Sequence, residues 1–327
     1  MADSKNSGAE FFRVIGAFAV VCIHTAPFRD YAGPAFLYPV TNNLTRFAVP
    51  FFFTLSGYFF GTSLKRGKTV DAVLWKYCKR LALLFFVWSL FYLLVPHASI
   101  RERLRLRPID TLFEGGTTHL WYFTALISAL LGLGFALKRK RLDLFWKVAL
   151  IFFGVAVFFQ SYAVTHPGIS LPFTLRNGPF FSSIFVGIGY WLSQQKRLPS
   201  LQTASLVTLL GLTLQELEVF AIWKFLGGDP LHDFTLGTLG FGAGMTMLAL
   251  QIRLPRRLLG VAELGKYTLG IYLLHLCTLE ILSRILSPYL DRASLLWQFV
   301  YPIGTFSSAL LLILILFRFR RLRPLIS

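Results

Sequence analysis

Apolar runs long enough to cross a bilayer recur from one end of this chain to the other. About 20 apolar residues in a helix span a ~30 Å hydrocarbon core, and 55% of the 327 residues are hydrophobic. The pattern predicts an all-α fold, a polytopic membrane helical bundle of about ten transmembrane helices. The predicted spans are 11–27, 44–62, 75–95, 119–137, 146–163, 178–194, 201–224, 232–251, 258–286 and 294–318. The run at 178–194 is short and glycine-rich, which makes it the weakest of the ten.

The basic residues, which give the chain a formal net charge of +18, fall in short clusters between the apolar runs. Such clustering is typical of membrane topology and not of a phosphate-binding surface, so nucleic acid is not an expected partner. Alternate connections carry most of the charge, within 65–80, 138–147, 196–197, 253–257 and 318–323. Because cytoplasmic loops are rich in Lys and Arg, both termini are predicted to be cytoplasmic.

One connection on the opposite side, 97–118, departs from this rule. Its Arg101, Arg103, Arg105 and Arg107 alternate with other residues, a period typical of extended chain. The segment either lies against outer headgroups, meets an anionic substrate, or is a solvated loop. Without a linker or a soluble extension, 1–327 is predicted to form a single transmembrane domain.

The first apolar run contains two ionisable residues, Arg13 and His24, eleven positions apart. In a helix this spacing places both on one face, about 16 Å apart along the axis. A charge at mid-membrane costs at least ~2.5–3.5 kcal/mol and usually faces a protein interior or a wet cavity. We therefore expect this helix to form one wall of a reaction chamber. The three cysteines, Cys22, Cys78 and Cys277, lack metal-binding or redox spacing and are read as small apolar fillers, with no metal expected.

Four motifs give the chain a resemblance to the acyltransferase-3 family of integral-membrane acyltransferases. They are the Arg13–His24 spacing, RFAVPFFFTLSGYFFG at 46–61, HLWYF at 119–123 and YTLGIYLLH at 267–275. The four occur in the order of the family and cover nearly the whole chain.

The resemblance implies transfer of an acyl group, often acetyl, from cytoplasmic acyl-CoA to a hydroxyl of a surface glycan or a lipid-linked saccharide. It implies a multi-pass protein of the bacterial inner membrane, with polysaccharide-assembly proteins as possible partners. The chain resembles the short members that act on enterobacterial common antigen or exopolysaccharide sugars, because it has no soluble domain of the SGNH hydrolase type.

The residues suggest how such a reaction would run. His24 is the expected general base, since an imidazole can take the proton of a hydroxyl near neutral pH. Arg13 either binds the phosphates of the donor or anchors the helix at the cytoplasmic surface. Lys76, Lys79 and Arg80 either add phosphate contacts or only set the topology.

For several further residues the sequence leaves the choice between a substrate-binding role and a structural role open. Arg46 either binds an oxyanion or an acceptor, or is an interfacial anchor, and His119, Trp121 and Tyr122 line an acceptor pocket or an aromatic belt. Arg176 and Asn177 are candidates to hydrogen-bond the acceptor. Glu216 is expected to orient His24 in the manner of a triad, Glu218 to contact a cation or substrate, and His275 to be structural or substrate-contacting.

The main alternative belongs to another functional class: a proton-coupled transporter or flippase of a glycan or lipid precursor. In that reading Arg13, His24 and Glu216 would form a proton relay. Internal repeats and paired broken helices are expected of many such transporters, and 1–160 does not repeat in 161–327.

Overall fold

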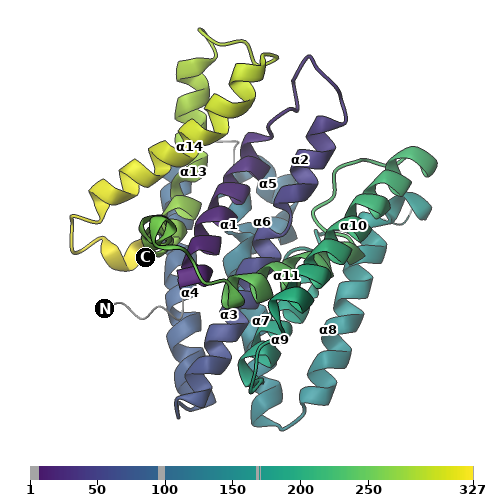
Figure 1. Cartoon of the computed structure of the whole chain (residues 1–327), viewed down its shortest axis with the longest axis vertical. Coiled ribbons are helices and arrows are strands. Elements are labelled where there is room, and N and C mark those ends of the chain that lie inside the picture. Colours follow the sequence, from purple (N-terminus) through teal and green to yellow (C-terminus); the bar gives the residue numbers. More distant parts are fainter. Residues whose placement is uncertain (1–6, 95–99, 167–168, 170, 327) are drawn as a thin grey trace. The chain divides into compact units, whose positions relative to one another are not determined.

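A computed structural model describes residues 7–94, 100–166, 169 and 171–326, and within these ranges every regular element is helical. Figure 1 shows the long rods that carry the chain back and forth. Among the residues that the structure describes, eight helical segments are long and apolar enough to cross a membrane. The principal helices are α1 (Ser7–Thr25), α2 (Leu37–Thr45), α3 (Ala48–Lys65), α4 (Val70–Leu94), α7 (Trp121–Lys138), α8 (Leu142–Ala156), α9 (Pro179–Gln194), α10 (Leu201–Phe225), α11 (Leu236–Gln251), α13 (Thr268–Leu286) and α14 (Leu295–Leu316).

Each predicted span overlaps one of these long helices, which confirms the helical bundle. The weakest prediction, 178–194, corresponds to α9. Both α9 and α11 have 16 residues, a rise of about 24 Å, which is less than a full hydrocarbon core. Their crossing of the membrane therefore stays a prediction, as does the cytoplasmic placement of the termini.

The helices pack into two compact units. The first comprises Met1–Val49, Pro199–Val219 and Gly240–Ser327, and the second comprises Pro50–Leu198 and Phe220–Leu239. The division describes how the helices pack within the chain. The single-domain assignment remains a prediction.

In the first unit α1 packs against α13, α14 and the short elements α12 (Leu259–Ala262) and η6 (Glu263–Tyr267). Val21, Ile271 and Ala309, each fully buried, form a core cluster among α1, α13 and α14. Figure 1 shows α13 and α14 side by side. This cluster fixes the spacing of the three helices one turn away from His24.

In the second unit α7, α8 and α9 pack together, and α4 packs on α7. The core is rich in phenylalanine, including Phe53, Phe153, Phe181, Phe185 and Phe234. Gly57 of α3 faces the backbone carbonyl of Val186 in α9, and a Cβ at that glycine would collide with it. The Ser56–Gly57–Tyr58 segment of the 46–61 motif thus allows α3 and α9 to pack closely, as small residues do in membranes.

The arginine-rich connection is helical, and the extended conformation predicted for it is wrong. It forms α5 (Ile100–Leu106) and α6 (Pro108–Glu114). Arg and Leu are both strong helix formers, and Pro108 occupies the first turn of α6, where its missing N–H costs nothing. Alternation of charge over seven residues is too short a pattern to override these preferences.

Candidate active site

Helix α1 carries both ionisable residues that the sequence singled out. Arg13 and His24 are each partly buried and lie on one unbroken helix, so the expected separation of about 16 Å holds. Arg13 is not isolated. Its Nη1 donates to both carboxylate oxygens of Glu10, at 2.9 and 3.0 Å. The sequence analysis missed this partner, although a carboxylate three positions before an arginine in a helix is a recognisable signal.

A glycine in η6 makes room for the Glu10–Arg13 pair. A Cβ at Gly265 would collide with the carboxylate and backbone of Glu10. The carboxylate is thus held against the backbone of η6, and the guanidinium is held by the carboxylate. The side chains of the pair remain 26% and 31% exposed, so the guanidinium can be reached from outside.

At the other end of α1, His24 lies beside His275 of α13. The ring centroids are 4.9 Å apart and the rings are tilted by 48°. His275 is fully buried, and its Nδ1 lies 2.6 Å from the carbonyl oxygen of Tyr272. The structure therefore brings together two histidines that are 251 positions apart in the sequence, a pairing that no local pattern could reveal.

Glu216, predicted to orient His24 in the manner of a triad, makes no hydrogen bond to His24 in the structure. Its Oε2 accepts a hydrogen bond from Nδ2 of Asn43 at 3.1 Å, and Gln215 donates to the Asn43 carbonyl at 2.9 Å. The other oxygen, Oε1, is buried and has no hydrogen-bond partner among the described residues. Asn43 on α2, absent from the predicted site, is the partner that a buried carboxylate needs.

The two acidic residues of α10 do not share one site. Glu216 and Glu218 are two positions apart, which places their side chains about 200° apart around the helix. Arg46, by contrast, lies close to the Asn43 segment. It follows α2 directly, and its Nε donates to Oδ1 of Asn42 at 2.8 Å. Asn42, Asn43, Gln215, Glu216 and Arg46 thus form a polar group that links α2 and α10.

In the HLWYF segment of the second unit His119, Leu120 and Phe123 are buried, and Trp121 and Tyr122 are partly buried. His119 is 2% exposed and packs edge-on against Tyr92 at 5.2 Å. Tyr122 stacks on Phe53 at 4.7 Å, and its hydroxyl lies 3.4 Å from that of Ser56. The burial of His119 favours a packing role over a place in the lining of an acceptor pocket. The ring of Trp121 contacts the guanidinium of Arg176.

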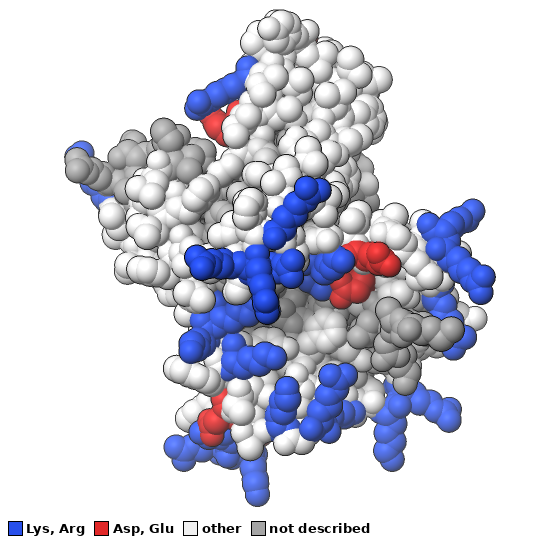
Figure 2. Space-filling model, turned by 90° about the vertical axis from the view of Figure 1, so that its left-hand side faces the viewer, with Lys and Arg blue, Asp and Glu red and all other residues white. Residues whose placement is uncertain are grey.

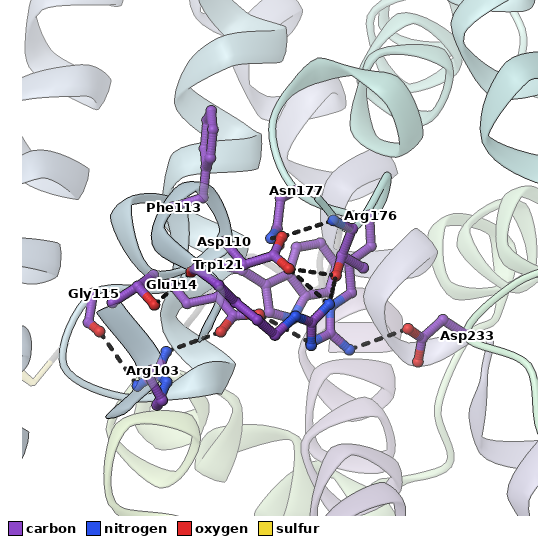
Figure 3. Close-up of polar contacts among 12 residues, drawn as sticks. Arg103, Asp110, Phe113, Glu114, Gly115, Trp121, Arg176, Asn177 and Asp233 are labelled. Atoms are coloured by element: carbon purple, nitrogen blue, oxygen red, sulfur yellow. Dashed lines mark hydrogen bonds and ion pairs between the residues drawn. The ribbon is translucent and has the colours of Figure 1, made fainter. Parts of the chain in front are cut away.

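Arg176 stands at the centre of a charged network in the second unit (Figure 3). It binds Glu114 at 3.2 Å and Asp233 at 3.1 Å, and its guanidinium lies 5.6 Å over the Trp121 ring. Burial alone would lower the pKa of Arg176, but the Asp233 and Glu114 carboxylates together outweigh it and raise that pKa above its ordinary value. The arginine is therefore charged at any working pH.

A second carboxylate centre, Asp110, completes the network. It is 1% exposed and accepts from the backbone N–H and the hydroxyl of Thr174, from Asn177 at 2.8 Å and from Arg107 at 2.7 Å. Arg103 binds Glu114 at 2.9 Å. Arg103 and Arg107 of the unusual 97–118 segment thus pair with carboxylates of their own chain. Asp110, Glu114 and Asp233 were not predicted from the sequence.

The three basic candidates of α4 are exposed. Lys76, Lys79 and Arg80 lie in its first half, and Lys79 Nζ is 5.6 Å from the ring of Trp75. Figure 2 shows a face on which Lys and Arg side chains are plentiful and Asp and Glu are few. Such a surface suits anionic groups, whether phosphates of a ligand or lipid headgroups.

Comparison with known proteins shows to which family the chain belongs. The acyltransferase domain of the acyltransferase-3 family matches residues 6–317. A serine/alanine racemase of Enterococcus gallinarum is 31% identical over 252 residues, which is 70% of this chain and 35% of that protein. An amino-acid racemase of Enterococcus faecalis is 27% identical over 302 residues, 86% of this chain and 42% of that protein.

The chain thus matches well under half the length of these two relatives, and racemase is the name of the longer proteins. No solved structure matches the chain. The family match extends over nearly every described helix, from α1 to α14. On this evidence the chain is a multi-pass membrane protein that belongs to the acyltransferase-3 family of acyltransferases.

Proposed function

We propose that this acyltransferase moves an acyl group, most simply acetyl, from cytoplasmic acyl-CoA to a hydroxyl of a surface glycan or lipid-linked saccharide. A bacterial inner membrane is the setting that this reaction requires. The observation that carries the proposal is the arrangement on α1, where one helix presents a guanidinium and, about 16 Å further along, an imidazole. That length is similar to the reach of the phosphopantetheine arm of CoA.

Arg13 is the proposed phosphate ligand of the donor. Among the described contacts Glu10 occupies only Nη1, and a guanidinium has five N–H donors in a planar fork. The remaining donors are available for a phosphate. Lys76, Lys79 and Arg80, exposed on α4 of the second unit, are proposed to attract phosphate groups at the surface of that unit.

The acceptor is proposed to bind at the polar group of α2 and α10. Amide, carboxylate and guanidinium side chains are the groups that bind sugar hydroxyls, and Glu216 Oε1 is a buried acceptor without a partner among the described residues. A hydroxyl donating to Oε1 would satisfy it. We therefore propose that Glu216 and Arg46 bind the acceptor and that His24 is the general base.

In this reaction His24 removes the proton from the acceptor hydroxyl as its oxygen attacks the thioester carbonyl. The C–S bond breaks, the new ester C–O bond is formed, and the CoA thiolate takes up the proton from His24. General-base assistance of this kind contributes ~10²–10⁴-fold to rate.

The test is acyl transfer by the purified protein in lipid nanodiscs, with radiolabelled acetyl-CoA and a lipid-linked saccharide. The wild type should label the saccharide, and His24→Ala should reduce the rate at least about 10²-fold while the protein stays folded. His166→Ala is the matched control, because His166 stacks on Phe158 at 4.3 Å, away from α1 in sequence and outside the proposed site. Labelling by His24→Ala at the wild-type rate would contradict the assignment.

A further inference from the structure

The last turn of α1, which carries His24, ends in a cap that is unusual for its sequence. The Ala26 N–H donates to the carbonyl of Cys22 at 2.9 Å, and Ala26 has a φ of 47°. Many helices end in this left-handed conformation, but the residue in it is usually glycine, because a Cβ is disfavoured there. His24 thus lies two positions before a strained cap.

The backbone is strained beyond the cap as well. Phe28 has a φ of 67°, again in the left-handed region, where a bulky residue is rarely found. Among the residues that the structure describes, one further non-glycine position has a positive φ, Lys140 in the connection between α7 and α8. Strained residues persist where surrounding contacts impose the conformation, and they concentrate at functional sites. The contacts that hold the segment after His24 are therefore of interest.

Gln298, near the start of α14, makes the central contact. Its Oε1 accepts the Phe28 N–H at 2.6 Å, and its Nε2 donates to the carbonyls of Arg292 at 2.6 Å and Ser294 at 3.1 Å. Because carbonyl oxygens only accept, the amide nitrogen must face them and the amide oxygen must face Phe28. The side chain is 3% exposed, so its orientation is fixed by these three bonds.

Two further contacts tie the same segment to the beginning of α14. The Ala32 N–H donates to the carbonyl of Ala293 at 3.1 Å. The ring of Phe28 packs edge-on against that of Phe299, with the centroids 5.9 Å apart. All of these residues belong to the first unit. Of the three contacts, the hydrogen bond from Phe28 to Gln298 acts directly on the backbone of a strained residue.

We propose that Gln298 is a positioning residue for His24. By binding the Phe28 backbone it holds the strained cap at Ala26 and keeps the last turn of α1 closed. Helix ends fray where their terminal groups are not held. Fraying would displace the imidazole, and a misplacement of about 1 Å can cost about 10²-fold in rate. The expected effect on rate rests on the proposed function, in which His24 is the base, whereas the hold on the helix end does not.

A rescue experiment separates positioning from packing. Gln298→Met keeps the length of the side chain and removes its three hydrogen bonds, and kcat should fall by about 10–10²-fold with the acyl-CoA KM unchanged. Ala26→Gly supplies a residue that adopts the cap without strain. Combined with Gln298→Met, it should therefore restore most of kcat. Wild-type kcat in Gln298→Met, or a double variant no faster than Gln298→Met, would overturn the proposal.

A further variant loads the cap without touching Gln298. Ala26→Val places a β-branched residue in the left-handed region, where it is strongly disfavoured, and kcat should fall in the same way even if Gln298→Met does not fold. Wild-type kcat in Ala26→Val would contradict the proposal.

Lys140→Gly is the matched control, because it relieves the same kind of backbone strain in the second unit. Added to Gln298→Met, it should raise Tm and leave the low kcat unchanged. Rescue of kcat by Lys140→Gly would show that Ala26→Gly acts through general stability, and the positioning role would be wrong.

Hydrogen–deuterium exchange gives a readout that is independent of turnover, since amide exchange reports local opening. Mass spectrometry of the peptide that spans 20–28 should show faster exchange in Gln298→Met and wild-type exchange in the double variant with Ala26→Gly. Unchanged exchange in Gln298→Met would overturn the inference. If exchange follows the prediction but the wild type acylates no saccharide, the proposed function fails and the hold on α1 stands.

Discussion

At the scale of single residues, the contact that most alters the expected chemistry is the one between Arg13 and Glu10. An arginine held by a carboxylate can bind a phosphate only in competition with that carboxylate or through its remaining donors. Because both side chains are about a quarter to a third exposed, the pair is worth at most about 1 kcal/mol. If Arg13 binds the donor as proposed, Glu10 is expected to weaken that binding without preventing it.

This competition predicts opposite effects for the two partners. Glu10→Gln should lower the acyl-CoA KM by up to about fivefold, because the competing charge is removed. Arg13→Ala should raise that KM, with kcat less affected. Steady-state kinetics at varied acyl-CoA measure both, and Glu263→Gln, at the start of η6, serves as a matched carboxylate control. An unchanged KM in Arg13→Ala would exclude the phosphate role.

The residues also show where sequence reasoning succeeds and where it stops. Arg13 and His24 were placed correctly relative to each other because helix geometry alone determines their spacing. Glu10 was within reach of the same argument. His275 and Asn43 were not, since their proximity to His24 and Glu216 depends on how distant helices pack. The roles assigned to all of these residues remain predictions.

At the scale of elements, the charged network around Arg176 ties three connections of the second unit together. It joins α5 and α6, the segment before α9, and the segment before α11. Two arginines of 97–118, Arg103 and Arg107, pair with the buried carboxylates Glu114 and Asp110, and a buried carboxylate is strongly destabilising once its partner is removed. An alternating pattern over so few residues predicted the wrong conformation, because the helix propensity of Arg and Leu and the local pairs Arg103–Glu114 and Arg107–Asp110 favour helices there.

We therefore expect the loss of Arg176 to reduce the stability of the fold. Arg176→Ala leaves Glu114, 5% exposed, and Asp233 with less compensation, and we expect a loss of about 1–3 kcal/mol, seen as a lower Tm. Arg141→Ala is the control, because its pair with Asp143 is 60% and 59% exposed and should contribute nothing measurable. A higher acceptor KM without a change in Tm would instead support the acceptor-binding role.

At the scale of the whole molecule, the hydropathy pattern was sufficient to predict the class of protein and every long helix. Apolar length and charge asymmetry are properties of the chain alone, so a sequence records them directly. The division into two compact units was not predicted, because it depends on which helices share a core. The orientation of the chain in the membrane is likewise a prediction from Lys and Arg placement.

The proposed reaction requires the acyl group to cross the membrane within the protein. Arg13 is predicted to lie near the cytoplasmic surface and His24 about 16 Å further out, so donor and acceptor should approach from opposite sides. Neither acetyl-CoA nor a soluble saccharide crosses lipid unaided, which makes sidedness measurable.

The most direct measurement is acyl transfer in sealed proteoliposomes that contain radiolabelled acetyl-CoA only inside and a saccharide acceptor only outside. With the wild type we expect labelled saccharide in the outer solution, and with His24→Ala we expect none. Labelled saccharide that forms only when both substrates are on the same side of the membrane would contradict the proposed reaction.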